Sequence, residues 1–172
     1  MSLIILGRDG VINHDLNEAI ISPAEWEPIE GSLEAIARLN HAGYRVIVST
    51  HQPGIEQGLL DVDTLTRIHS KMRRMLAQVG GKIEAILYCP HDSEQCECQR
   101  SQGGAYLELA NRLRIDLNNV ISVSSHLASI ASAQAVAIKP LLVKTGKESF
   151  ADELDAYNDL SGVADALLKG DI

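Results

Sequence analysis

The sequence predicts an α/β fold in which helices cover both faces of a doubly wound parallel sheet. Two observations support this prediction. Short apolar runs alternate along the chain with longer segments whose apolar residues recur at helical spacing. The 172 residues, 45% of them apolar and without a linker or repeat, suit one domain over residues 1–172 with a single core. In such sheets the functional site lies beyond the carboxyl ends of the strands.

The expected strands are short apolar runs bounded by turn residues. The first, residues 3–6, is continuously apolar and leads into Gly7-Arg8-Asp9-Gly10, so it reads as a buried strand that enters a loop. The other runs are comparably apolar and follow helical segments. They are residues 45–49, 83–88, 120–123 and 140–143.

The expected helices alternate with these strands. Ser32 is predicted to be the N-cap of a helix that Gly43 ends, and Asp61 the N-cap of a longer helix that ends at Gly80. Apolar residues at helical spacing predict three further helices, at residues 105–114, 127–136 and 163–168.

Composition excludes several classes of partner. The net charge is −8 and no stripe of Lys and Arg is visible, which argues against nucleic acid as a ligand. No apolar run approaches the roughly 20 residues that span a bilayer, so no membrane partner and a cytoplasmic location are expected. The sequence identifies no protein partner.

Three cysteines and a histidine lie within ten residues of one another, in the loop 89–98. Cys89, His91, Cys96 and Cys98 would supply three thiolates and one imidazole, a tetrahedral set that suits Zn²⁺. An odd number of cysteines in a reducing compartment also favours a metal over disulfides. The set has no open position, so the predicted zinc is structural and does not activate water.

Three segments resemble a known family. Residues 4–13, which include Gly7-Arg8-Asp9-Gly10, are similar to the first motif of the haloacid dehalogenase superfamily, an apolar strand followed by Asp-x-Asp-Gly. Residues 48–55 look like its second motif. The 89–98 loop resembles that of the D-glycero-D-manno-heptose-1,7-bisphosphate 7-phosphatases and the related histidinol-phosphatase domain. The resemblance implies a Rossmann-like fold with a small or absent cap, and a phosphatase role in making the heptose of lipopolysaccharide.

The resemblance also assigns roles to residues, and the chain departs from several of them. The nucleophilic aspartate would stand at position 7, where this chain has Gly7, while Asp9 occupies the acid/base position. Thr50 and His51 fall at phosphate- and substrate-binding positions, and Arg100 is the remaining candidate for the cation that neutralises the phosphate. Glycine has no side chain that could form a phosphoaspartate.

The late motif of the family holds Mg²⁺ with aspartates. Ser125 and Ser129 fall at these positions, so the resemblance implies that both carboxylates are absent. Neutral hydroxyls bind a hard dication weakly, so Mg²⁺ is not expected as a cofactor.

Three functions remain open. The first is a pseudo-phosphatase that binds a phosphorylated sugar or a protein. The second is an active sugar phosphatase that uses Asp9 by an altered route, and the third is an assembly protein. A Ser–His–Asp site built from Ser124, Ser125, His51 or His126 is disfavoured because no spacing fixes a triad, and Asp15 is expected at the surface or in a cap.

Overall fold

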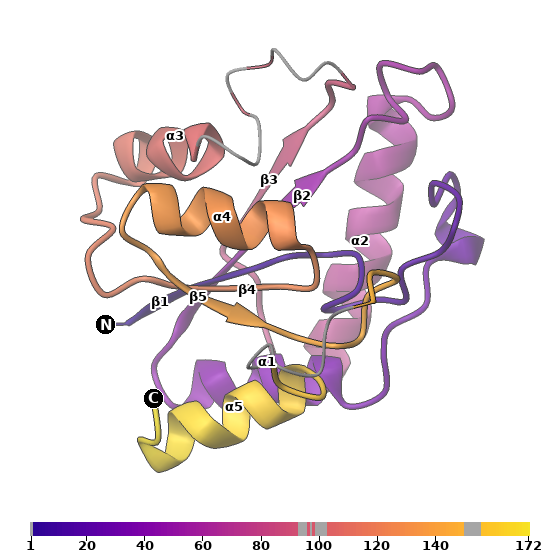
Figure 1. The fold of residues 1–172 in the computed structure, drawn as a ribbon. Coiled ribbons are helices and arrows are strands. Elements are labelled where there is room, and N and C mark those ends of the chain that lie inside the picture. Colours follow the sequence, from indigo (N-terminus) through magenta and orange to yellow (C-terminus); the bar gives the residue numbers. More distant parts are fainter. Residues whose placement is uncertain (1, 93–95, 97, 99–102, 150–155) are drawn as a thin grey trace.

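A computed structural model describes residues 2–92, 96, 98, 103–149 and 156–172 (Figure 1). Its centre is a parallel five-stranded sheet with the strand order β3-β2-β1-β4-β5. The reversal of strand order beside β1 makes the sheet doubly wound, as predicted. The strands are β1 (Leu3–Leu6), β2 (Arg45–His51), β3 (Ala85–Cys89), β4 (Ile121–Ser124) and β5 (Lys139–Leu142).

The helices form a layer on each face of the sheet, so the architecture has three layers (Figure 1). Three helices pack on one face and two on the other, each bringing apolar side chains to the sheet. The first group is α1 (Ser32–His41), α2 (Val62–Gln78) and α5 (Leu160–Lys169), and the second is α3 (Gly104–Leu113) and α4 (Leu127–Ala135).

Side chains of β1 alternate between two separate hydrophobic cores. Ile4 and Leu6 join the core under α1, α2 and α5, whereas Leu3 and Ile5 join the core under α3 and α4. All four are buried because β1 is the central strand and is covered on both faces. This burial explains why the strand is a continuous apolar run rather than an alternating one.

The expected elements are all present, with boundaries shifted by a few residues. Asp61 caps α2 as predicted, since its Oδ1 accepts a hydrogen bond from the backbone N–H of Thr64 at 2.7 Å. The cap predicted for α1 is wrong by one position. Gly31 is the N-cap, with a φ of 79° that favours glycine, and Ser32 is the first helical residue. The Ser32 hydroxyl donates instead to the carbonyl oxygen of Ile12 at 2.6 Å.

The connection between β1 and α1 covers residues 7–31, all of which the structure describes. Its one regular element is the short 3-10 helix η1 (Pro23–Glu25), which agrees with the expectation of a small or absent cap. Trp26 closes this connection onto the core and is fully buried. Among the described residues, no helix is both long enough and apolar enough to span a membrane.

Candidate active site and metal cluster

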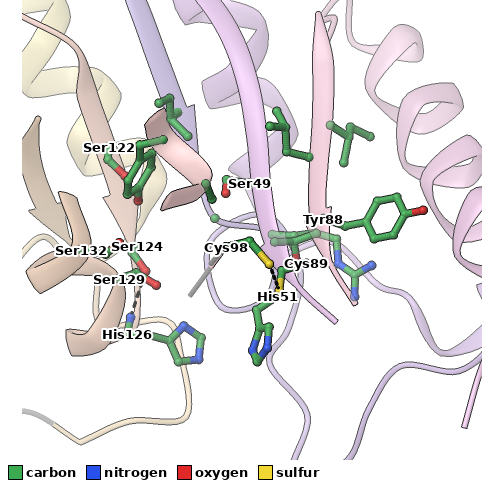
Figure 2. A pocket seen from close by; sticks show the side chains of 18 of the residues that line it. Ser49, His51, Tyr88, Cys89, Cys98, Ser122, Ser124, His126, Ser129 and Ser132 are labelled. Atoms are coloured by element: carbon green, nitrogen blue, oxygen red, sulfur yellow. Dashed lines mark hydrogen bonds between the residues drawn. The ribbon is translucent and has the colours of Figure 1, made fainter. Parts of the chain in front are cut away.

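A pocket of about 360 Å³ opens beyond the carboxyl ends of β1, β2, β3 and β4, the edge predicted for the site. Figure 2 shows one wall made by serines of β4 and α4, and a facing wall that includes His51, Tyr88 and Cys89. Hydroxyl groups dominate the polar part of its lining. They belong to Ser49, Thr50, Tyr88, Tyr106, Ser122, Ser124, Ser129 and Ser132.

The loop after β1 carries the first two predicted site residues into this pocket. Gly7 lines the pocket and its backbone N–H donates to the carbonyl oxygen of Val123 on β4, at 2.8 Å. The chain then turns back at Gly10, whose φ is +77°. A Cβ at Gly10 would lie 2.3 Å from Oγ of Ser125, so glycine is required there by both conformation and space.

Asp9 has both carboxylate oxygens occupied by hydrogen bonds. Oδ1 accepts from Nε and Nη2 of Arg8 at 3.0 and 2.9 Å and from Nδ2 of Asn13 at 2.9 Å. Oδ2 accepts from Nε2 of Gln52 at 2.9 Å. The same Gln52 amide donates to Oγ1 of Thr50 at 2.9 Å, so it links two predicted site residues. These bonds fix the orientation of the carboxylate.

The buried side chain of Arg8 contacts both Asp9 and the partly buried His69. The side chain of Arg8 is 0% exposed, and its Nη1 lies 3.2 Å from Nε2 of His69 on α2. Burial, and next the charge of Arg8, lower the pKa of His69 to about 4. The ring is therefore neutral at pH 7 and accepts the hydrogen bond from Arg8.

Ser125 and His126 form a hydrogen-bonded chain that ends at Asp15, so the expectation that Asp15 lies in a solvated position is wrong. Oδ2 of Asp15 is 3.2 Å from Nε2 of His126, and the Asp15 side chain is only 6% exposed. Nδ1 of His126 lies 3.2 Å from Oγ of Ser125. Burial works against the charged carboxyl, but hydrogen bonds from His126 and Lys147, and their charges, hold the pKa of Asp15 below its usual range.

Ser125, His126 and Asp15 do not have the arrangement of a Ser–His–Asp nucleophile. Ser125 is fully buried, lies outside the pocket lining, and donates its hydroxyl to the carbonyl oxygen of Asp9 at 3.2 Å. It is also enclosed between two glycines, since a Cβ on Gly146 would lie 2.5 Å from Ser125 Oγ. A substrate could not reach this hydroxyl.

The remaining predicted site residues differ in their surroundings. Ser129 and His51 line the pocket, and His51 Nε2 also bonds the carbonyl oxygen of His91 at 2.6 Å. Arg100 lies outside the described residues. Sequence reasoning gave no role to Asn13, Gln52 or His69. Gln52 and His69 are far along the chain from their partners and give no local signal, whereas Asn13 is only four residues from Asp9. Sequence reasoning also missed the pairing of Arg8 with Asp9, although the two are adjacent.

The predicted zinc ligands converge at one side of the pocket. The ligand atoms of Cys89, His91, Cys96 and Cys98 all lie within 4.8 Å of one another. The sulfurs of Cys96 and Cys98 are also close enough for a disulfide. A metal explains the cluster better, because Cys89 and His91 meet at the same point and a disulfide would leave them without a role. Three sulfurs and one nitrogen could hold Zn²⁺ as a structural ion.

Comparison with known proteins decides the family. The chain is 40% identical over 177 residues to D-glycero-beta-D-manno-heptose-1,7-bisphosphate 7-phosphatase of Bordetella bronchiseptica, covering 98% of this chain and 99% of that protein. It is 42% identical to the Neisseria meningitidis serogroup A protein of the same name over 148 residues, which cover 86% of this chain and 79% of that protein. The chain belongs to the D-glycero-beta-D-manno-heptose-1,7-bisphosphate 7-phosphatase family. No family model matches it.

Solved structures of this phosphatase family have the same fold. The D,D-heptose 1,7-bisphosphate phosphatase of B. bronchiseptica, complexed with magnesium and phosphate, superposes with a TM-score of 0.90 at 40% identity, covering 99% of both chains. The corresponding Burkholderia thailandensis enzyme superposes with a TM-score of 0.73 at 38% identity, covering 98% of this chain and 99% of that chain. An L-2-haloacid dehalogenase superposes with a TM-score of 0.58 at 14% identity, covering 86% of this chain and 59% of the dehalogenase chain. This similarity shows a common fold alone. The expected fold of the haloacid dehalogenase type is confirmed.

Proposed function

We propose that this member of the heptose-bisphosphate phosphatase family binds a phosphorylated sugar but does not hydrolyse it. The observation that carries the proposal is the scarcity of carboxylates in the pocket. Among the described lining residues only Asp9 and Glu108 are acidic. Both oxygens of Asp9 are already bonded, and Oε1 of Glu108 accepts from Nη2 of Arg112 at 2.5 Å.

This lining does not fit Mg²⁺. The ion requires oxygen ligands in octahedral geometry, and one or two of them are commonly carboxylates. Neutral serine hydroxyls are poor substitutes for these carboxylates. At the two positions where the resemblance expects aspartates, Ser125 donates its hydroxyl to Asp9 and Ser129 offers only a hydroxyl. A phosphate dianion would therefore meet no metal to offset its repulsion from an attacking group.

Under this proposal the chain lacks the nucleophile as well as the Mg²⁺ carboxylates. In the family pattern a carboxylate at position 7 would attack phosphorus and form a covalent intermediate. Gly7 offers no side chain, and no other carboxylate of the described lining takes its place. Binding is still supported, since the pocket keeps its hydroxyl-rich wall. We expect the ligand to be a heptose phosphate from the synthesis of lipopolysaccharide precursors, encountered in the cytoplasm.

An active phosphatase that uses Asp9 as a general base is the competing function. It is favoured by one observation, that Oδ2 of Asp9 accepts a single hydrogen bond among the described residues and the side chain is 22% exposed. A water molecule could bond to this oxygen and attack phosphorus directly.

A calorimetric titration with D-glycero-beta-D-manno-heptose-1,7-bisphosphate, followed by phosphorus NMR of the same sample, separates the two functions. The proposal predicts saturable binding and an intact ester after prolonged incubation with Mg²⁺. Loss of the 7-phosphate signal by wild type, but not by Asp9→Asn, would establish the competing function. Absence of binding at millimolar ligand would reject both and leave an assembly role.

A further inference from the structure

Asp9 presents a hydrogen-bond acceptor to the pocket in a fixed orientation. Oδ1 accepts three N–H bonds, two from the Arg8 guanidinium, which can only donate, and one from Nδ2 of Asn13. Oδ2 accepts from Gln52 alone among the described residues, and the Asp9 side chain, 22% exposed, lines the pocket. A carboxylate oxygen has two lone pairs. Oδ2 can therefore accept one further hydrogen, from a ligand.

Two buried hydroxyls of the lining are available as donors. Oγ of Ser124 accepts from the backbone N–H of His126 at 3.1 Å, and a backbone N–H can only donate. Oγ1 of Thr50 accepts from the amide nitrogen of Gln52 at 2.9 Å. Ser124 is 4% exposed and Thr50 is 7% exposed, and no described residue accepts the hydrogen of either hydroxyl. Each O–H is thus left to donate to a ligand.

The acceptor and the two donors lie at the carboxyl ends of three adjacent strands. Oδ2 of Asp9 and Oγ1 of Thr50 share one partner, since each lies 2.9 Å from Nε2 of Gln52. Ser124 ends β4, on the other side of β1, and a Cβ on Gly7 would lie 3.9 Å from its Cα. Figure 2 shows Ser124 on the wall of the pocket that β4 and α4 form. Gly7, which follows β1 between β2 and β4, has no side chain to fill the space.

We propose that the pocket binds a tetrahedral oxyanion that carries its own hydrogen, either hydrogen phosphate or the monoanion of a phosphate monoester, and discriminates against sulfate. The P–OH group donates to Oδ2 of Asp9, while other oxygens of the anion accept from Ser124 and Thr50. The inference deepens the proposed function and rests on it, because it names the form in which a phosphate group enters a pocket that does not fit Mg²⁺. Asp9 is then the residue that determines this specificity.

Sulfate has the shape and the charge of hydrogen phosphate but no hydrogen to donate. One of its oxygens would face Oδ2 of Asp9 with no hydrogen between them, so two acceptors would be in contact. A site built to bond a ligand hydroxyl rejects an analogue that lacks it, because its own polar group is left unpaired. Asp9 is partly exposed, so water relieves part of this cost. We expect a preference of at least about tenfold for phosphate.

The other charges around the pocket act almost equally on the two anions, because hydrogen phosphate and sulfate both carry two negative charges. Arg8 is paired with Asp9, and His69, whose pKa burial lowers to about 4, is neutral at pH 8. Titratable groups of the described lining stand on each surrounding element. They are His51 of β2, Tyr88 and Cys89 of β3, Cys98, Tyr106, Glu108 and Arg112 of α3, and His126 before α4, with Asp15, Lys147 and Glu148 behind His126.

The first experiment titrates the zinc-loaded protein with inorganic phosphate and with sulfate, by calorimetry at pH 8 without Mg²⁺. Wild type should bind phosphate at least about tenfold more tightly than sulfate. Equal affinities, tighter binding of sulfate, or no saturable binding of phosphate would overturn the proposal. Neither probe contains an ester, so this failure is distinct from that of the proposed function, which hydrolysis of heptose bisphosphate would reject.

The variant Asp9→Asn replaces the acceptor with a group that can also donate. Its preference for phosphate should disappear, and its affinity for sulfate should rise above that of wild type, because the amide N–H can donate to a sulfate oxygen. Asp171→Asn, which removes the same charge at an exposed position, is the matched control and should keep the preference. An undiminished preference in Asp9→Asn would contradict the role of this carboxylate.

The variant Ser124→Ala leaves the Arg8–Asp9 pair intact and tests the donor side. It should weaken the binding of both anions by a similar factor, because both use the hydroxyl as a donor, and so keep their ratio. Wild-type affinity for both anions, or a lost preference for phosphate, would count against the arrangement.

Methyl phosphate extends the test to a monoester. It has a P–OH only as its monoanion, which forms as the pH falls through about 6. Its affinity relative to that of sulfate should therefore rise between pH 8 and pH 6. Sulfate keeps its charge over this range, so the ratio corrects for titration of His51 and His126. A constant or falling ratio would overturn the proposal for monoesters.

Discussion

Arg8 directs two nitrogens of its guanidinium, Nε and Nη2, at a single oxygen of its neighbour Asp9, at 3.0 and 2.9 Å. The Arg8 side chain is 0% exposed and that of Asp9 is 22% exposed. The chain turns back directly after this pair, at Gly10. The charge of Asp9 is thus offset from within the protein, and its carboxylate orientation is fixed before a ligand arrives.

Removing the buried partner of this pair should destabilise the fold. Arg8→Met is expected to lower the free energy of unfolding by about 3 kcal/mol, because the partly buried carboxylate of Asp9 loses its compensating charge. Urea unfolding at pH 7 measures the change. The double variant Arg8→Met/Asp9→Asn should recover part of the loss. If the two substitutions prove additive, the pair contributes no coupling and this account of it is wrong.

His69 should make stability depend on pH. Its pKa in the folded protein is about 4, against a usual 6.5, so between these values the unfolded chain binds more protons. The stabilisation is complete above about pH 6.5 and is lost as the pH falls toward 4. The loss amounts to roughly 2 kcal/mol after allowance for the partial exposure of the ring.

The pH effect is measured as a difference between two proteins. The free energies of unfolding of wild type and of His69→Gln are measured at pH 7 and pH 5. Their difference at each pH cancels contributions common to both proteins, including any release of zinc. Gln keeps an acceptor for Arg8 but does not titrate. The stability difference between the two proteins should shift in favour of His69→Gln at pH 5. Parallel pH profiles would mean that the His69 ring is not held neutral.

The cluster in the 89–98 loop should bind one zinc ion per chain. X-ray absorption should show three sulfur atoms at about 2.3 Å and one nitrogen at about 2.0 Å from the metal. Cys89→Ser removes the buried ligand at the end of β3 and should abolish stoichiometric zinc, whereas His41→Gln should retain it. Full zinc occupancy in Cys89→Ser, or a protein purified with no metal and a stable disulfide, would contradict this assignment.

Restoring the missing carboxylates should restore affinity for Mg²⁺. Gly7 has no positive φ, and a Cβ there would meet Val11 Cγ2 at 3.2 Å and the Val123 carbonyl oxygen at 3.5 Å, so an aspartate needs only a small adjustment. Ser125 occupies a space kept open by two glycines. The triple variant Gly7→Asp/Ser125→Asp/Ser129→Asp is therefore expected to bind Mg²⁺ at least about tenfold more tightly than wild type.

Calorimetry with Mg²⁺ alone checks this prediction, and Gly7→Ala/Ser125→Asn/Ser129→Asn is the matched neutral control. Equal affinity in the two triple variants would show that the site differs from that of its relatives in more than these three positions.

Local patterns predicted the fold well because each strand and helix is specified by its own residues. The apolar run of β1 and the Asp61 cap of α2 could be predicted without knowledge of their neighbours. The predicted zinc ligands are likewise close in sequence and meet in space. By contrast, the N-cap of α1 was misplaced, because Ser32 bonds a distant carbonyl and Gly31 supplies the turn.

The polar network of the site could not be predicted, since its partners meet only after the sheet has formed. Asp15 appeared to be a surface residue because nothing beside it in sequence shows that it lies against His126. Gln52 reaches Asp9, and His69 reaches Arg8, from elements far along the chain. Sequence spacing predicts which residues lie at the same edge of the sheet, but it does not predict which of them form hydrogen bonds.

Release of inorganic phosphate from D-glycero-beta-D-manno-heptose-1,7-bisphosphate is the measurement that tests the central claim most directly. It should be made with stoichiometric protein and saturating Mg²⁺, with the B. bronchiseptica phosphatase as positive control and Asp9→Asn as the control for contaminants. The absence of a nucleophile at Gly7 and of Mg²⁺ carboxylates predicts no release by wild type above that of Asp9→Asn. A Mg²⁺-dependent release that Asp9→Asn abolishes would contradict the account.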